Sequence, residues 1–268
     1  MIIFHMKEQR HCYLIRVQFL GFRYSGWQKQ PGQKTVESML IKTLKFILPA
    51  RKFKILGAGR TDAKVSALDA AFELFLEGSP LEDHDDFIQV FNMNLPPDIR
   101  VVGISLVGED FNIIKNGTCK EYVYLFSFGQ KNHPFCAPFL ANIVEDLDIE
   151  LMIKSAKLFE GTHDFSTYTA RLQKNTKVIR TITSCDIQIN TMLEANFFPK
   201  KTYALVVQGE GFMRYQIRMM MGALIQLGKF ELSIEDLTLS LKTKNNLQLN
   251  YVAPGSGLFL NKLEFNIL

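Results

Sequence analysis

The stretch KFKILGAGRTDAKVSALDAAFELFL, residues 52–76, places a loop rich in glycine and charge between two β-prone segments. Apolar residues dominate positions 52–59 and nearly alternate with other residues after Leu68, which predicts a strand on each side. Glycines at the start of the loop allow the backbone to bend sharply. The loop is therefore expected to hold Arg60 and Asp62 beyond the end of a strand, at the rim of a cleft.

Two common uses of a glycine-rich loop do not fit this one. A dinucleotide-binding G-x-G-x-x-G loop requires glycine where this chain has Asp62, and a carboxylate there would repel pyrophosphate. A phosphatase-type nucleophilic aspartate requires a second carboxylate where this chain has Lys64. Two interpretations of Asp62 remain: a turn residue that hydrogen-bonds nearby backbone, or a reactive carboxylate flanked by Arg60.

Hydrophobic periodicity along the rest of the chain predicts strands and helices in turn. In the first half we expect strands at 12–20, 52–59, 67–76 and 99–107, and helices at 35–48 and 85–93, with Thr35 as an N-cap. In the second half we expect strands at 120–128, 178–190, 201–209 and 257–265, and helices at 149–160, 212–227 and 233–241. This order predicts an α+β fold of two similar domains, residues 1–109 and 110–268. Each domain is an antiparallel or mixed sheet with helices on one face, and a cleft lies between them.

Two charged residues in the predicted helix 212–227 stand out from its apolar stripe. Arg214 and Arg218 are four residues apart, where like charges destabilise an isolated helix by about 0.2–0.5 kcal/mol unless an anion is near. One of them is therefore expected to meet a carboxylate or a phosphate. In the strand 120–128, Tyr122 and Tyr124 share a face, which by itself is typical of core packing.

The composition is that of a globular protein, with 47% hydrophobic and 22% charged residues and a net charge of +4. The four cysteines, Cys12, Cys119, Cys136 and Cys185, lack metal-ligand spacing and are interpreted as reduced thiols, so we expect no metal site. No apolar run approaches the roughly 18 residues of a membrane span, and the amino terminus lacks a secretory segment. These features predict a cytoplasmic protein without a membrane association.

The segment RLQKNTKVIR, residues 171–180, concentrates positive charge. It carries four basic residues and no acidic one, so it could attract phosphates, although a solvated loop would have the same composition.

Seven segments, taken in order, resemble the tRNA pseudouridine synthase A family. They are FRYSGWQKQ (22–30), GAGRTDAKVSA (57–67), NMNLPPDIRV (92–101), CKEYVYLF (119–126), GTHDFSTY (161–168), GFMRYQIRMMMGAL (211–224) and APGSGLFL (253–260). Together they extend over nearly the whole chain.

The resemblance implies an isomerase without cofactor or metal that converts uridine to pseudouridine in the anticodon stem-loop of tRNA, at positions 38, 39 and 40 in tRNA numbering. It places the family's catalytic aspartate at Asp62, its loop arginine at Arg60, its active-site tyrosine at Tyr122 and its basic partner at Arg218. We expect the arginine to keep Asp62 ionised when RNA excludes water from the site. Asp62 would then attack the sugar or the uracil ring, or stabilise cationic character at C1′. Tyr122 would stack on the uracil or take a proton from the sugar.

The family's RNA partner requires contacts that offset the cost of extruding a nucleotide from its helix. The candidate contacts are basic or aromatic residues: Arg23, Trp27, Lys29, Lys64, Arg171, Lys174, Lys177, Arg180 and Arg214. The resemblance also implies a homodimer. The alternatives that remain are a pseudouridine synthase with a different RNA target and an RNA-binding module without catalysis.

Two positions of the catalytic loop depart from the family's usual bacterial pattern G-R-T-D-A-G-V-H-A. This chain has Lys64 in place of the glycine and Ser66 in place of the histidine. Lysine lacks glycine's backbone freedom and adds a positive charge. These changes bear on loop geometry and on the choice of target uridine more than on the reaction.

The sequence predicts that ionic strength affects activity more than metal chelation does. Salt screens phosphate contacts and should weaken both RNA binding and turnover steeply, whereas EDTA should leave turnover unchanged. Pseudouridine formation measured over a salt series, with and without EDTA, checks both expectations. Loss of activity in EDTA that a divalent ion restores would contradict them.

Overall fold

The computed structural model describes residues 9–170, 172, 176–243, 247–249 and 251–266, and its described part is built around one large sheet. The strands are β1 (Arg10–Phe19), β2 (Phe53–Gly57), β3 (Ser66–Glu77), β4 (Ile99–Val107), β5 (Gly117–Phe128), β6 (Ala141–Ile143), β7 (Gly161–Asp164), β8 (Ile179–Ile189), β9 (Tyr203–Gly209) and β10 (Leu258–Phe265). The α-helices are α1 (Val36–Ile47), α2 (His84–Asn94), α3 (Ile149–Ala156), α4 (Gln216–Gly228) and α5 (Ile234–Ser240).

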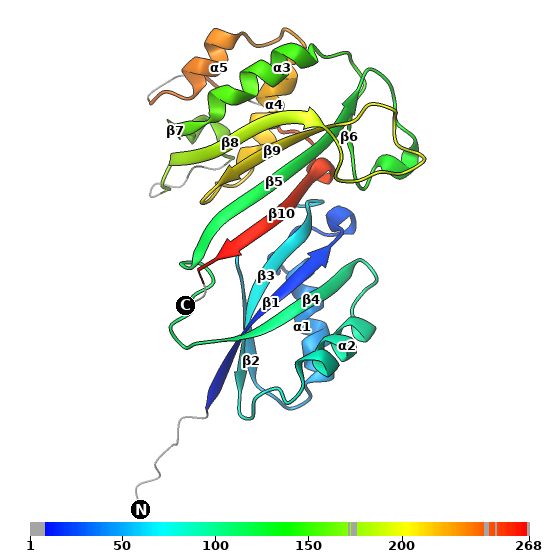
Figure 1. The fold of residues 1–268 in the computed structure, drawn as a ribbon, viewed down its shortest axis with the longest axis vertical. Helices are drawn as coiled ribbons and strands as arrows, with labels where there is room; N and C mark the ends of the chain where they lie inside the picture. The colour runs from blue at the N-terminus through cyan, green and yellow to red at the C-terminus, as the bar shows by residue number, and fades with distance from the viewer. Residues whose placement is uncertain (1–8, 171, 173–175, 244–246, 250, 267–268) are drawn as a thin grey trace, which may run out of the picture.

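Strand β10 joins the two halves of the chain (Figure 1). The strand order is β4-β1-β3-β10-β5-β9-β8-β7, with β2 paired to β3 and β6 paired to β5. Strand β10 is antiparallel to β5 but parallel to β3, which it meets at Phe259↔Ser66 and Leu260↔Ala67. This parallel contact immediately follows the loop that carries Asp62, so the chain's last strand supports the loop.

The helices all pack on one face of the sheet. Leu258 is paired with Tyr124 and Leu260 with Tyr122, so these four side chains point to the same side. Leu258 belongs to an apolar core that includes α3, α4 and α5, whereas Leu260 belongs to a core that includes α1 and α2. The predicted α+β class with helices on one face is confirmed. The division into domains at residue 110 stays a prediction.

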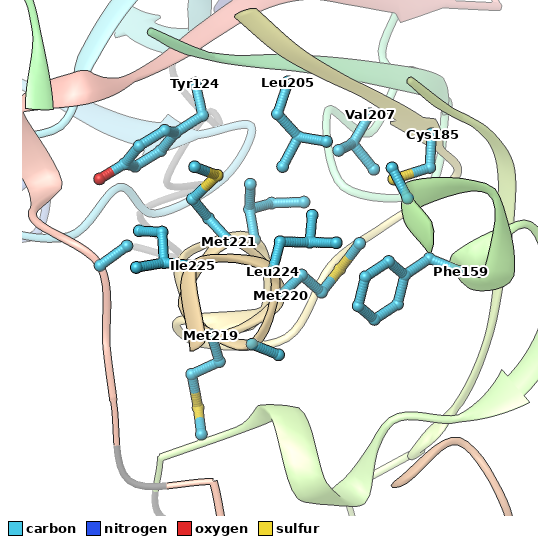
Figure 2. Packing of buried hydrophobic residues seen from close by; sticks show 14 of the residues in the cluster. Tyr124, Phe159, Cys185, Leu205, Val207, Met219, Met220, Met221, Leu224 and Ile225 are labelled. Atoms are coloured by element: carbon cyan, nitrogen blue, oxygen red, sulfur yellow. The ribbon is translucent and has the colours of Figure 1, made fainter. Parts of the chain in front are cut away.

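Helix α4 is the centre of the larger core. Figure 2 shows it lying against the sheet, with Leu205 and Val207 pointing at it from β9 and Tyr124 of β5 in the same cluster. Met220 and Met221 are fully buried there, which agrees with their predicted role in packing rather than in binding a cofactor. Removing one buried methionine of this kind typically costs about 2–5 kcal/mol. The helix is thus a rigid platform for the residues at its amino end.

The opposite face of the sheet is covered by irregular segments. Near β5 these carry Phe139, Phe197 and Phe198, which pack over Val123 and Leu125. The alternation of β5, with Tyr122 and Tyr124 on the helical face and Val123 on the other, follows the predicted pattern. Both faces of the central strands are therefore buried.

The sequence predicted most elements within a few residues of their observed ends. Thr35 caps α1 as expected, since its side chain accepts a hydrogen bond from the Ser38 backbone N–H. The helix expected at 212–227 begins only at Gln216, because Tyr215 takes a left-handed conformation with φ of 64°. The prediction that Arg214 lies on that helix is wrong. Strands β6 and β7 were not predicted, since each is four residues or shorter.

Within the described ranges, no disulfide links the cysteines and no helix has the character of a membrane span. All four cysteines are unpaired, and three of them are buried. None of the described helices is long and apolar enough to cross a bilayer.

The turn after β1 packs directly against the Asp62 loop. The Trp27 N–H donates to the Thr61 carbonyl at 3.1 Å, and the Lys64 N–H donates to the Tyr24 carbonyl at 3.0 Å. This close approach requires glycine in the turn. A Cβ on Gly21 would lie 1.8 Å from the Val65 carbonyl oxygen, and one on Gly26 would lie 2.6 Å from that of Thr61. The turn therefore fixes the loop through backbone contacts.

We expect Gly21→Ala to destabilise the protein by about 1–3 kcal/mol or more, because the new methyl group overlaps backbone rather than a flexible side chain. Gly103→Ala is the matched control, since a Cβ there meets nothing within 4 Å. Urea unfolding of the two variants and the wild type measures the difference. Equal stability of the two variants would show that the turn and the loop do not pack as described.

Candidate active site

A cleft of about 860 Å³ opens beside the Asp62 loop. It brings together the loop, strand β5, the amino end of α4 and the turn after β1. Of the residues predicted for the site, Asp62, Arg60, Tyr122, Lys29 and Arg214 line it. Side chains that the sequence did not single out also line it, including Lys120, Phe212, Tyr215 and Gln216.

The Asp62 loop closes on itself in a tight turn. The Val65 N–H donates to the Asp62 carbonyl at 3.2 Å, and Lys64 between them has a φ of 67°. Lysine thus adopts the left-handed conformation that glycine favours, so Lys64 keeps the turn that the family's glycine would form. Ser66, at the other position of departure, accepts a hydrogen bond from the Gly21 N–H at 2.9 Å.

Arg218 of α4 pairs with Asp62 across the two halves of the chain. Its Nη1 lies 3.5 Å from the Asp62 Oδ2, and the two side chains are only 15% and 18% exposed. The Arg218 Nε donates to the Ala253 carbonyl at 2.7 Å, while the Ala253 N–H donates to the Arg218 carbonyl at 3.1 Å. The segment before β10 therefore orients the guanidinium. At 3.5 Å the ion pair is loose, which leaves the carboxylate with capacity for another partner.

The pKa of Asp62 is raised above its ordinary value of 3.8. Burial is the largest cause, and the charges of Arg218 and Arg214 together with the hydrogen bond from Arg218 act in the opposite direction. The expectation that an arginine keeps Asp62 ionised stays a prediction, and the two arginines act in that direction. Removing water from the carboxylate therefore affects its pKa more than the nearby cations do.

Tyr122 lies on the floor of the cleft with its ring against Phe212. The two rings are T-shaped, with centroids 5.3 Å apart. Burial first, and then the negative charge of Asp62, raise the pKa of the Tyr122 hydroxyl far above its ordinary value. Tyr122 is therefore a neutral phenol at physiological pH. Its hydroxyl has no hydrogen-bond partner among the residues that the structure describes.

Arg214 reaches the site from the non-helical segment that precedes α4. Arg214 and Arg218 lie over the Tyr215 ring, each with its guanidinium carbon 4.9 Å from the ring centroid. The left-handed conformation of Tyr215 turns the chain so that both arginines act on Asp62. The predicted meeting of this arginine pair with a carboxylate is thus found, although the pair does not share a helical face.

Lys120 is a charged residue of the cleft that the sequence analysis missed. Its Nζ donates to the Ala58 carbonyl at 3.1 Å, and no carboxylate pairs with it in the described part of the chain. Burial lowers the pKa of its ammonium group. The residue lies two positions before Tyr122, so the alternation of a strand places both on one face. This two-residue alternation was the signal in the sequence that could have identified Lys120.

The other predicted contact residues have different surroundings. Arg60 and Lys29 are exposed at the cleft, and Lys64 is exposed with its Nζ 5.5 Å from the centre of the Phe22 ring. Arg23 is exposed but forms an ion pair with Asp98 at 2.7 Å, which offsets its charge.

Trp27 differs from the other predicted contacts because it is only 3% exposed and packs in the core beside Phe19. Its ring leaves no face for a base, so its role in this structure is to support the turn. Lys177 is exposed and Arg180 is partly buried, and neither lines the cleft. Arg171 and Lys174 lie outside the described residues.

Comparisons with known proteins show the family of this chain. A family model described as tRNA pseudouridine synthase matches residues 155–266. The tRNA pseudouridine synthase A of Bacillus sp. (strain KSM-64) is 32% identical over 255 residues, which cover 94% of this chain and 99% of the relative. The chain belongs to the tRNA pseudouridine synthase A family. Another member, from Thermodesulfovibrio yellowstonii, is 31% identical over 258 residues and covers 93% of this chain and 97% of its own. The member from Dictyoglomus thermophilum is 29% identical over 251 residues, or 94% and 98% of the two chains.

The buried ammonium of Lys120 makes a prediction about stability. A lysine whose pKa is lowered by folding destabilises the folded state while it is charged, and this penalty disappears as pH rises above the folded pKa. The free energy of unfolding of Lys120→Met minus that of wild type should therefore be largest at neutral pH. This difference should decline in alkaline solution, where the wild-type lysine loses its charge. Urea unfolding across this pH range measures it, with Lys45→Met, an exposed lysine of α1, as the control. A pH-independent difference would contradict the buried charge.

Proposed function

We propose that this chain isomerises uridine to pseudouridine in tRNA, with Asp62 as the catalytic carboxylate. The observation that carries the proposal is the Asp62 side chain, largely withdrawn from water yet 3.5 Å from Arg218, in a cleft that also contains Tyr122. Withdrawal from water makes a carboxylate more reactive, and the guanidinium preserves its charge. Family membership supports the same chemistry.

The reaction needs no net oxidation, because uridine and pseudouridine are isomers. The bond from N1 to C1′ breaks, the uracil turns, C5 bonds to C1′, and the proton that C5 loses is balanced by one that N1 gains. An anionic oxygen of Asp62 serves this sequence by attack on the sugar or the ring, or by stabilising positive charge at C1′. Our proposal includes either role.

Tyr122 and Arg60 have complementary roles in this proposal. The raised pKa of Tyr122 disfavours the phenolate, so the neutral ring is better suited to stacking on the uracil and donating a hydrogen bond than to removing a proton. Arg60 is exposed at the cleft and forms no ion pair with the described residues. Its guanidinium is therefore free to contact a phosphate of the extruded nucleotide.

The proposal also specifies the target uridines in tRNA and the oligomeric state of the protein. We place the target at uridines 38, 39 and 40 of the anticodon stem-loop, reached by extrusion of the nucleotide at a cost of a few kcal/mol. Lys29 and Arg214, which line the cleft, and Lys64, which is exposed on the Asp62 loop, would offset that cost through phosphate contacts. We also propose that the protein acts as a homodimer in the cytoplasm.

The competing function is an RNA-binding module without catalysis. Such a module would use the same basic residues, but a desolvated carboxylate in its groove would repel phosphate and weaken binding. The position of Asp62 favours catalysis for this reason.

We expect Asp62→Asn and Asp62→Ala to abolish pseudouridine formation while leaving tRNA affinity within a few-fold of wild type. Both changes remove the anionic oxygen, and neither removes a phosphate contact. Nucleoside mapping of unmodified tRNA incubated with each variant checks this, with Asp110→Asn as the control because Asp110 is exposed and outside the cleft. Conversion by an Asp62 variant at the wild-type rate would refute the assignment, and a wild-type protein that binds tRNA without converting any uridine would favour the module.

A further inference from the structure

Two side chains of the cleft each have a buried polar atom without a hydrogen-bond partner among the described residues. Six buried side-chain atoms lack a partner within the described ranges: His11 Nε2, Thr61 Oγ1, Glu73 Oε1, Arg180 Nε, Gln216 Nε2 and Gln226 Oε1. Of these residues, only Thr61 and Gln216 line the cleft. A buried polar group without a partner costs about 1–3 kcal/mol, so its persistence at a binding site indicates that a ligand supplies the partner.

Gln216 is held in a defined orientation. It is the first residue of α4 and is 1% exposed. Its Oε1 accepts a hydrogen bond from the Met213 N–H at 2.8 Å, and a backbone N–H can only donate. The amide nitrogen is therefore directed away from that contact. The contact with the Met213 N–H accounts for the oxygen of this side chain and leaves the amide nitrogen without a partner among the described residues.

The missing partner of Gln216 is an acceptor that reaches a buried position. Phosphates of an RNA backbone would meet the basic side chains first, since Lys29 and Arg60 line the same cleft and are exposed. A neutral amide beneath them is suited to a neutral carbonyl oxygen. Thr61, whose hydroxyl can donate or accept, provides a second unused group next to Asp62.

We propose that the Gln216 amide donates a hydrogen bond to a carbonyl oxygen of the extruded uracil. This inference rests on the function proposed above and adds the residue that recognises the base. A donor at this position favours uracil at its O4 atom, where cytosine carries an amino group that also donates. Gln216 lines the same cleft as Asp62, so a base bound by its amide lies in the cleft that holds the carboxylate. Thr61 is available for the other polar edge of the ring.

The first experiment replaces the donor while keeping the fold. Gln216→Glu retains an oxygen for the Met213 N–H but has no N–H, and Gln216→Met removes the donor without adding charge. We expect both to lower kcat/KM for unmodified tRNA by roughly ten- to hundredfold, the range for a buried polar group that loses its partner. Gln226→Met is the matched control, because Gln226 lies on the same helix with an unpartnered buried oxygen but outside the cleft. It should retain wild-type turnover, and thermal melting checks that all variants fold.

The second experiment changes the substrate. A tRNA anticodon arm with 4-thiouridine or 2-thiouridine at the target position carries a weaker sulfur acceptor in place of one carbonyl oxygen. If Gln216 contacts the substituted oxygen, the wild-type protein should have a lower kcat/KM on one of the two thio-substrates than on uridine. The Gln216 variants, which already lack this contact, should show little further decrease on the same thio-substrate. This non-additivity would identify the oxygen.

Two results would overturn the inference. One is wild-type kcat/KM in both Gln216 variants, and the other is an equal penalty from the variants on uridine, 2-thiouridine and 4-thiouridine. Failure of the proposed function is distinguishable from either result, because wild-type protein would then form no pseudouridine on any substrate.

Discussion

The contact between Asp62 and Arg218 depends on the whole architecture, because each residue comes from a different half of the chain. Asp62 lies on the loop between β2 and β3, and Arg218 lies on α4, 156 residues later. Strand β10 holds these halves in one sheet by pairing with both β3 and β5. The segment that leads into β10 also binds the Arg218 guanidinium through the Ala253 carbonyl. A single strand therefore positions both members of the pair.

The energetic balance at this pair supports the catalytic role that we propose for Asp62. A close, fully formed ion pair would lower the pKa of the aspartate and satisfy its oxygens. Here the loose contact leaves desolvation as the larger effect, so the carboxylate is raised in energy without being neutralised by contact. The same low-water environment keeps Tyr122 neutral and leaves the Gln216 amide without a partner. The cleft thus contains polar groups whose unused hydrogen-bonding capacity a bound ligand can satisfy.

Much of this fold could be predicted because local patterns and tertiary packing agree. Alternation placed Tyr122 and Tyr124 on one face, and the Thr35 cap defined the start of α1. The start of α4 could not be predicted, because Tyr215 takes a left-handed conformation that is uncommon for a residue other than glycine. The sequence also could not show whether the Trp27 side chain packs in the core or is exposed, since an aromatic residue in a glycine-rich turn is compatible with both. Lys120 and Gln216 were missed because their importance comes from burial against other segments.

A titration of the Asp62 side-chain carboxyl tests the account most directly. Carbon-13 NMR of carboxyl-labelled protein, with Asp62→Asn used to assign the resonance, would follow its protonation in wild type and in Arg218→Gln. The account predicts a midpoint above the ordinary value of 3.8 in wild type and a still higher midpoint in Arg218→Gln, because the arginine lowers a pKa that burial has raised. A wild-type midpoint at or below 3.8 that does not respond to the loss of Arg218 would contradict it.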